Sequence, residues 1–179
     1  MVFGMNTLDV DAWFPSRYGV DDEAGALIEI TAASRVAAAR LVRTGTVYDL
    51  AHVLHGKVPA FPGDAVLFHT GWGTLWDTDP ARYPTAEPGP GLALGAWLAE
   101  RRVALTGCDT WSYGPVPAEE PDEPFAVPQM LNVRHGIVVL ENLRLAQLAA
   151  AGVREFMLVV SHPKRRGATG AGVAPLAIV

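Results

Sequence analysis

The stretch GIVVLENLRLAQLAAAGVREFMLVV, from Gly136 to Val160, decides the fold class. A hydrophobic run of strand composition ends at Glu141, a helical stretch follows, and a second apolar run begins after Gly152. Strand, helix and strand in succession are typical of an α/β protein. An acid at the end of a buried strand is costly unless it is paired or binds a cation, so Glu141 is the first candidate for a functional residue.

The rest of the chain continues this alternation, which predicts an α/β fold with a mixed sheet and flanking helices in one domain over residues 1–179. Thr31 is a predicted N-cap. The predicted helices are 32–42, 92–102, 129–134 and 145–151, and the predicted strands are 46–54, 65–72, 103–109, 137–140, 155–161 and 173–179. Two proline-rich loops, 76–91 and 111–128, follow strand ends, where α/β folds bind ligands.

Composition excludes several classes of function. The chain has 179 residues, a net charge of -5 and no basic cluster larger than Lys164-Arg165-Arg166, so we expect no nucleic-acid partner. No apolar stretch approaches the ~20 residues of a membrane span, so we expect no membrane partner. Cys108 is the single cysteine, which excludes an intrachain disulfide and fits a reducing compartment, so we predict a cytoplasmic protein.

Gln129 and Glu141 are the first candidates for metal binding. Gln129 begins a short predicted helix and Glu141 ends the strand after it, so a helix, a turn and a strand bring both side chains toward one pocket. Carboxylate and amide oxygens can bind a hard cation, although two ligands are too few on their own. The alternative is structural, with Glu141 capping a helix or pairing with Arg144.

The histidines do not form a helical metal-binding pair such as HExxH. Two of the five, His69 and His135, adjoin both a predicted strand and a glycine turn and are the better functional candidates; the others are His52, His55 and His162. Tryptophans in the loops after strands either line an aromatic substrate pocket or anchor the loops, and these are Trp72, Trp76 and Trp111. Cys108 lies in an apolar strand and is expected to pack rather than to react.

The chain resembles the cyclase family of metal-dependent hydrolases, which includes bacterial kynurenine formamidase and isatin hydrolase. The resemblance covers nearly the whole chain, and its segments follow the family's order. The matching segments are RYGVDDEAGALIEIT (17–31), AARLVRTGTVYDLAH (38–52), GDAVLFHTGWGTLW (63–76), ALTGCDTWS (104–112), PFAVPQMLNVRHGIVVLENLRL (124–145) and EFMLVVSHPKRRGATGAGVAPLAI (155–178).

The resemblance implies a swivelling β/β/α fold, a homo-oligomer, and hydrolysis of a small cyclic or formyl amide of an aromatic compound by water that a zinc or manganese ion activates. Glu141 matches the family's metal-site glutamate. Gln129 matches the position twelve residues earlier, which is usually histidine and is glutamine in proteins similar to isatin hydrolase. By this resemblance Gln129 and Glu141 are metal ligands, while Trp72, Trp76 and Trp111 contact the substrate.

The chain departs from the family at its defining motif, His-x-Gly-Thr-His-x-Asp, which supplies most of the metal ligands and is absent here. Lys57 to Pro62 run directly into Gly63, where an internal block of roughly ninety residues is missing by comparison with typical members. A catalytic metal site needs about three protein ligands, so the resemblance implies an incomplete fold with impaired activity, or a binding module that associates with a full-length paralogue. Resequencing around Pro62 and Gly63 distinguishes a deletion from an error in the gene model.

Overall fold

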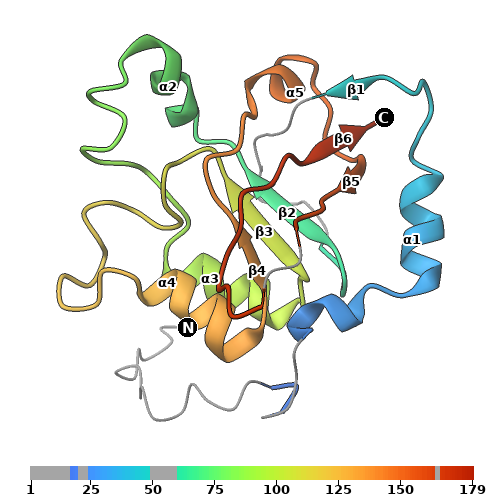
Figure 1. The fold of residues 1–179 in the computed structure, drawn as a ribbon, viewed down its shortest axis with the longest axis horizontal. Coiled ribbons are helices and arrows are strands. Elements are labelled where there is room, and N and C mark those ends of the chain that lie inside the picture. The colour runs from blue at the N-terminus through green and yellow to red at the C-terminus, as the bar shows by residue number, and fades with distance from the viewer. Residues whose placement is uncertain (1–16, 20–23, 49–59, 164–165) are drawn as a thin grey trace, which may run out of the picture.

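The computed structural model of the chain describes residues 17–19, 24–48, 60–163 and 166–179 (Figure 1). His52, His55 and the end of the predicted strand 46–54 lie outside these described residues. Among the helices of the described part, none combines the length and the hydropathy of a membrane span.

Two three-stranded sheets lie at the centre of the fold. The first is parallel and has the order β2-β3-β4, with β2 at Ala65–Phe68, β3 at Leu105–Cys108 and β4 at Val138–Leu140. The second is antiparallel and has the order β1-β6-β5, with β1 at Val47–Tyr48, β6 at Leu176–Ile178 and β5 at Met157–Val159. The predicted α/β class with parallel and antiparallel strands is confirmed, and the two kinds of pairing occupy separate sheets.

The helices are short, and α1, α3, η4 and α5 follow the predicted positions, whereas η2 and η3 were not predicted and α4 replaces the end of the predicted loop 111–128. The predicted loop 76–91 is wrong at its beginning, because α2 occupies Leu75–Thr78. Thr31 caps α1 as predicted: its side chain accepts a hydrogen bond from the Ser34 N–H at 3.1 Å. The bounds are η2 Gly25–Glu29, α1 Ala32–Ala39, η3 Trp72–Thr74, α3 Leu92–Glu100, α4 Ala126–Gln129, η4 Met130–Arg134 and α5 Ala146–Ala150.

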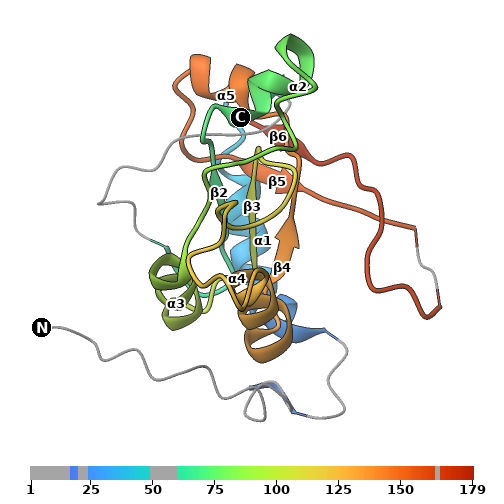
Figure 2. The same ribbon diagram turned by 90° about the vertical axis from the view of Figure 1, so that its left-hand side faces the viewer.

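The parallel sheet separates two apolar cores, because successive side chains of a strand point to opposite faces. One face packs against α3, α4 and η4; its core includes Val66, Leu98 and Leu131. The other face packs against the antiparallel sheet and α5; its core includes Leu67 and Leu148. The layers are therefore helices, parallel sheet and antiparallel sheet, the β/β/α order that the resemblance implies (Figure 2).

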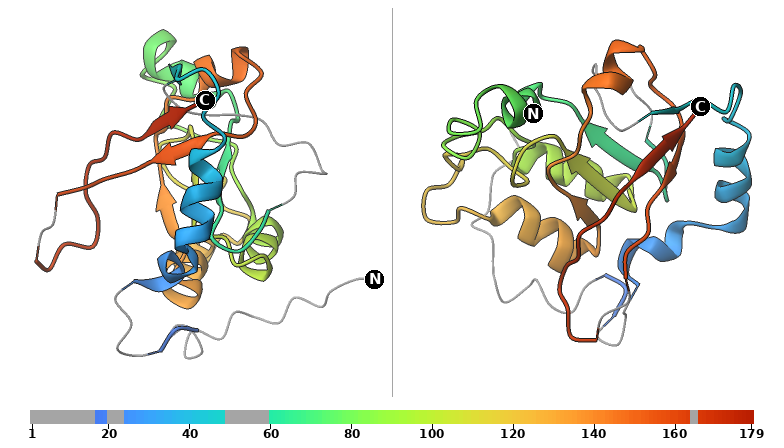
Figure 3. Two further views of the ribbon diagram at one scale, coloured as in Figure 1. Left: turned by 90° about the vertical axis from the view of Figure 1, so that its right-hand side faces the viewer. Right: turned by 45° about the horizontal axis from the view of Figure 1, so that its top comes forward.

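The outer side of the antiparallel sheet is poorly covered. Helix α1 contacts β5, and Figure 3 shows it alongside this sheet, yet none of the α1 residues is buried. Val159 and Leu176, which pair across β5 and β6, are 40% and 44% exposed. These apolar side chains are therefore accessible for contact with another surface.

Candidate functional site

The three parallel strands end at one edge of their sheet, and each is followed at once by a residue with a titratable side chain. His69 follows β2, Asp109 follows β3 and Glu141 follows β4. The segments 70–91 and 110–125 continue from this edge, and α2 and α5 lie at the same end of the molecule (Figures 1 and 2). Ligands bind at this edge in open α/β sheets, so it is the candidate functional site.

Asp109 is the buried centre of this edge, with 1% of its surface exposed. Its Oδ1 accepts hydrogen bonds from the backbone N–H and the hydroxyl of Thr70 at 2.8 and 2.6 Å. Its Oδ2 accepts from the N–H groups of Gly71 and Gly73 at 2.9 and 3.3 Å, and His69 Nε2 lies 3.3 Å away. These donors offset the cost of burying the carboxylate and fix the turn that carries the tryptophans.

Glycine is required at position 73 by this close approach. A Cβ atom on Gly73 would lie 2.8 Å from the Asp109 carbonyl oxygen and 3.0 Å from its Cβ. Gly71, two residues earlier, has a φ of 83°, a left-handed conformation that glycine adopts without strain. The segment Gly71 to Gly73 therefore wraps closely around the Asp109 carboxylate and binds it with backbone N–H groups.

Tyr83 joins the tryptophan turn to the residue after Glu141. Its backbone carbonyl accepts a hydrogen bond from Trp72 Nε1 at 3.0 Å, and its ring packs edge-on against Trp76 with the centroids 5.5 Å apart. Its hydroxyl donates to Asn142 Oδ1 at 2.8 Å. Burial, followed by the nearby charges of Glu87 and Asp109, raises the pKa of Tyr83, so its hydroxyl stays protonated and keeps donating.

Two carboxyl groups rest on consecutive N–H groups of the Trp111–Tyr113 turn. Glu87 accepts from the Ser112 N–H at 3.2 Å through Oε1 and 3.4 Å through Oε2, while Glu141 Oε1 accepts from the Tyr113 N–H at 3.1 Å. Burial raises the pKa of Glu87 to about 7; the Ser112 and Trp111 N–H groups oppose this, and the charges of Glu141 and Asp109 add to it. Atoms packed around the Glu141 carboxyl group raise its pKa by desolvation, although the residue as a whole is exposed, and the Tyr113 N–H opposes the shift.

The predicted metal ligands occupy different surroundings. Glu141 follows β4 at the site edge, whereas Gln129 is the last residue of α4; both residues are exposed. Among the described residues, no group of three or more His, Cys, Asp or Glu side chains could hold a metal ion. The structural alternative was that Glu141 caps a helix or pairs with Arg144. Instead, Glu141 accepts a hydrogen bond from the Tyr113 N–H, and Arg144 lies 3.8 Å from Asp77.

The predicted substrate tryptophans are partly brought together. Trp72 and Trp76 both contact Tyr83, and the Arg82 guanidinium lies 5.3 Å from the centroid of the Trp72 ring. Trp111 is carried by the turn after β3 and is 36% exposed, against 57% for Trp76. All three therefore follow strand ends at the candidate edge, as the sequence predicts.

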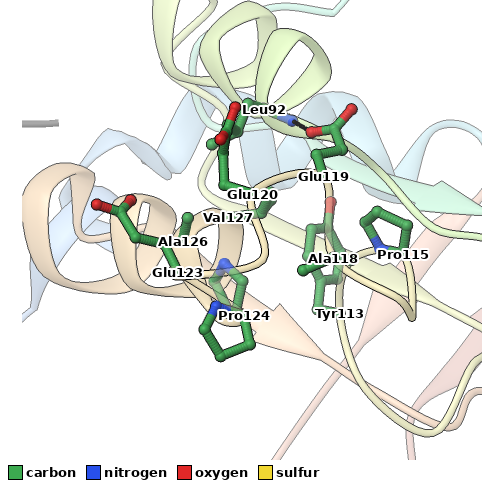
Figure 4. Close-up of a pocket in the computed structure, with 12 residues that line it drawn as sticks. Leu92, Tyr113, Pro115, Ala118, Glu119, Glu120, Glu123, Pro124, Ala126 and Val127 are labelled. Atoms are coloured by element: carbon green, nitrogen blue, oxygen red, sulfur yellow. Dashed lines mark hydrogen bonds between the residues drawn. The ribbon is translucent and has the colours of Figure 1, made fainter. Parts of the chain in front are cut away.

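A hollow near this edge lies between the beginnings of α3 and α4, and none of the three tryptophans lines it (Figure 4). Its rim carries the carboxyl groups of Glu119, Glu120 and Glu123, and the rest of its lining is mostly apolar and includes Tyr113 and three prolines, Pro115, Pro124 and Pro128. The Glu119 carboxylate accepts a hydrogen bond from the Leu92 N–H at 2.6 Å and so closes the first turn of α3. The hollow therefore lies between two helices and has an acidic rim.

The two histidines that the sequence favours lie at opposite edges of the parallel sheet. His69 is at the site edge, where burial lowers its pKa and the charge of Asp109 opposes the shift. His135 precedes β4, and its Nδ1 lies against the Arg17 guanidinium. Burial, then the charges of Arg17 and Arg134, lower the pKa of His135 to about 4, so it is a neutral structural acceptor at pH 7.

Sequence reasoning missed Tyr83 and Glu87 as site residues. It also missed Asp109, although Asp109 carries the same signal as Glu141, an acid directly after a buried strand, and that signal could have found it. Cys108 packs as predicted: it is fully buried, and burial raises the pKa of its thiol to about 12. Its Sγ accepts from the Thr110 hydroxyl at 2.8 Å.

The fold and the site define an α/β protein whose polar residues gather at the carboxyl edge of a parallel sheet. The chain belongs to the Cyclase family, whose model matches residues 19–115. No curated protein matches the sequence.

Solved structures are also similar to this chain. One described as a novel cyclase is 17% identical, with a TM-score of 0.71, and the match covers 92% of this chain and 98% of that chain. An isatin hydrolase bound to the product analogue thioisatinate is 24% identical, with a TM-score of 0.57, over 70% of this chain and 48% of its own. A potential metal-dependent hydrolase with cyclase activity is 17% identical, with a TM-score of 0.47, over 86% of this chain and 75% of its own. The first two matches show that this chain and those proteins have similar folds. The chain spans about half the length of the isatin hydrolase.

Proposed function

We propose that this chain derives from metal-dependent hydrolases of small cyclic or formyl amides of aromatic compounds, and that alone it hydrolyses such amides poorly or not at all. The observation that carries the proposal is the donor set at the site edge. Among the described residues, no three side chains of the His, Cys, Asp and Glu types are placed so that they could hold a metal ion. A catalytic zinc needs about three protein ligands and an open position, so these residues do not fit the metal that the resemblance implies.

The positions of the acids support this reading. Asp109 is surrounded by donors of its own chain, and Glu87 is buried on the Ser112 N–H, so neither carboxylate is free to bind a cation. Glu141 is exposed and remains the donor that we expect to contact any metal present, with Gln129 as its partner. Two such oxygens give a weak site for zinc or manganese.

Metal content and hydrolysis test the proposal together. The purified chain, incubated with zinc or manganese and then desalted, should retain far less than one ion per chain by elemental analysis. Isatin and N-formylkynurenine should stay unhydrolysed, with an isatin hydrolase assayed in parallel as the positive control. One tightly bound ion per chain together with hydrolysis of either compound would overturn the proposal.

A second function rests on the exposed apolar side chains. Trp76 and Trp111 at the site edge are solvent-accessible, as are Val159 and Leu176 on the antiparallel sheet. These surfaces suit a module that holds a small aromatic ligand and associates with another cyclase-family chain or with itself. The match with the novel cyclase over 92% of this chain and 98% of that chain supports a shared fold of this size. We place this module in the cytoplasm, consistent with its buried free thiol.

Light scattering after size-exclusion chromatography and a thermal-shift assay with isatin distinguish this function from the first. A homo-oligomer, or a rise in Tm with ligand, supports the module. A stable monomer whose Tm does not change at any isatin concentration contradicts it.

A further inference from the structure

Glu87 joins the two long segments that follow β2 and β3. Its backbone forms an isolated antiparallel bridge with Val116, donating to the Val116 carbonyl at 3.0 Å and accepting from the Val116 N–H at 2.9 Å. Its side chain turns inward, is 4% exposed with the rest of the residue, and accepts from the Ser112 N–H. One residue therefore connects the two segments through both its backbone and its carboxyl group.

The surroundings of this carboxyl group are acidic. Asp109 from the end of β3 and Glu141 from the end of β4 face it and disfavour its charged form. Tyr83 on its own segment and Cys108 on β3 also lie within its electrostatic reach. Among the described residues, the ion pairs of this region are His69–Asp109 and Arg144–Asp77, and neither includes Glu87.

Ionised Glu87 is thus a buried charge that backbone N–H groups alone stabilise, beside two further carboxylates. Burying a charge without an opposite charge is costly, whereas a neutral carboxyl group in the same place can still accept from Ser112. We propose that Glu87 is a pH-operated tie: its neutral side chain stays buried between the two segments and holds them together over the site edge, whereas its ionised side chain favours leaving this buried place, which opens the contact with the Trp111–Tyr113 turn. This inference does not depend on whether the chain hydrolyses an amide.

The sign of the pH dependence follows from linkage. The pKa of Glu87 is raised from its ordinary value of 4.5 to about 7, so the tied form binds more protons than the opened form. The tie is strongest below pH 4.5, weakens as the pH rises toward about 7, and changes no further above it. Trp111 lies directly before Ser112, whose N–H donates to Glu87. The exposed Trp111 side chain should therefore become less firmly positioned between pH 4.5 and about 7.

Amide hydrogen exchange measured by NMR on the full chain tests the tie. The protection factors of the Ser112 and Val116 amides should fall by up to about tenfold per pH unit between the two pKa values and then level off. In the variant Glu87→Gln, which is neutral and keeps an acceptor oxygen, these protection factors should be flat across the interval. The control Glu120→Gln removes an exposed carboxylate from the neighbouring segment and should keep the wild-type slope.

Two outcomes would overturn the tie: a wild-type slope in Glu87→Gln, or a flattened slope in the Glu120→Gln control. A second measurement needs no variant and decides the matter if Glu87→Gln does not fold. Carboxyl ¹³C spectra of the wild-type protein should show one glutamate that titrates near pH 7. The absence of such a glutamate contradicts the proposal.

Discussion

Replacing Asp109 with asparagine should destabilise the protein far more than its small change in shape suggests. Each carboxylate oxygen accepts two hydrogen bonds, from Thr70 on one side and from Gly71 and Gly73 on the other. An asparagine keeps one acceptor oxygen and turns an NH₂ group toward backbone N–H donors in either orientation. A buried donor without a partner costs about 1–3 kcal/mol, and two such donors cost about 2–5 kcal/mol.

Urea denaturation followed by tryptophan fluorescence measures this loss. For a domain of this size, whose slope is about 2–3 kcal/mol/M, the midpoint should fall by about 1–2.5 M. The matched control is Asp79→Asn, because Asp79 is exposed and its side chain accepts a single hydrogen bond, from the Arg82 N–H at 3.2 Å. We expect the control to change the free energy of unfolding by less than about 0.5 kcal/mol. A midpoint for Asp109→Asn equal to that of the control would refute the claim that the four donors around the Asp109 carboxylate stabilise the fold.

Leu148→Ala removes a fully buried side chain between α5 and the two sheets and should cost about 2–5 kcal/mol of unfolding free energy, measured by the same denaturation. The lowered pKa of His135, about 4 against an ordinary 6.5, means that stability falls as the pH falls from 6.5 to 4; His135→Gln should therefore show a smaller drop in Tm over that interval by calorimetry. Glu141→Ala should abolish whatever metal the chain retains, and unchanged metal content on elemental analysis would remove Glu141 from the site.

Local chemistry made most of the secondary structure predictable. Thr31 caps α1 because threonine followed by an alanine-rich stretch is a strong helix start, and the apolar run before Glu141 is a buried-sheet strand. The predicted end of α1 at residue 42 was too late: the helix ends at Ala39, and no buried side chain fixes another turn against the sheet.

Site residues were predictable only where an acidic residue directly follows an apolar strand. Glu141 was singled out because it follows a buried strand; Asp109 follows one too and was overlooked, although the topology of a parallel sheet brings both to one edge. Glu87 and Tyr83 lie in a proline-rich segment without periodicity, and their partners Ser112 and Asn142 are distant in sequence. Such contacts depend on how two segments dock against each other, which local patterns do not encode.

The order of strands in the antiparallel sheet constrains how the chain assembles. β6 lies between β1 and β5, so β1 has no neighbour in its sheet until residues 176–178 exist. The parallel sheet needs only residues 65–140 and can form while the rest of the chain is being synthesised. Pairing strands so far apart in sequence is slow, which leaves β1 and the apolar face of the parallel sheet exposed during biosynthesis. Those segments are where a chaperone would be expected to bind.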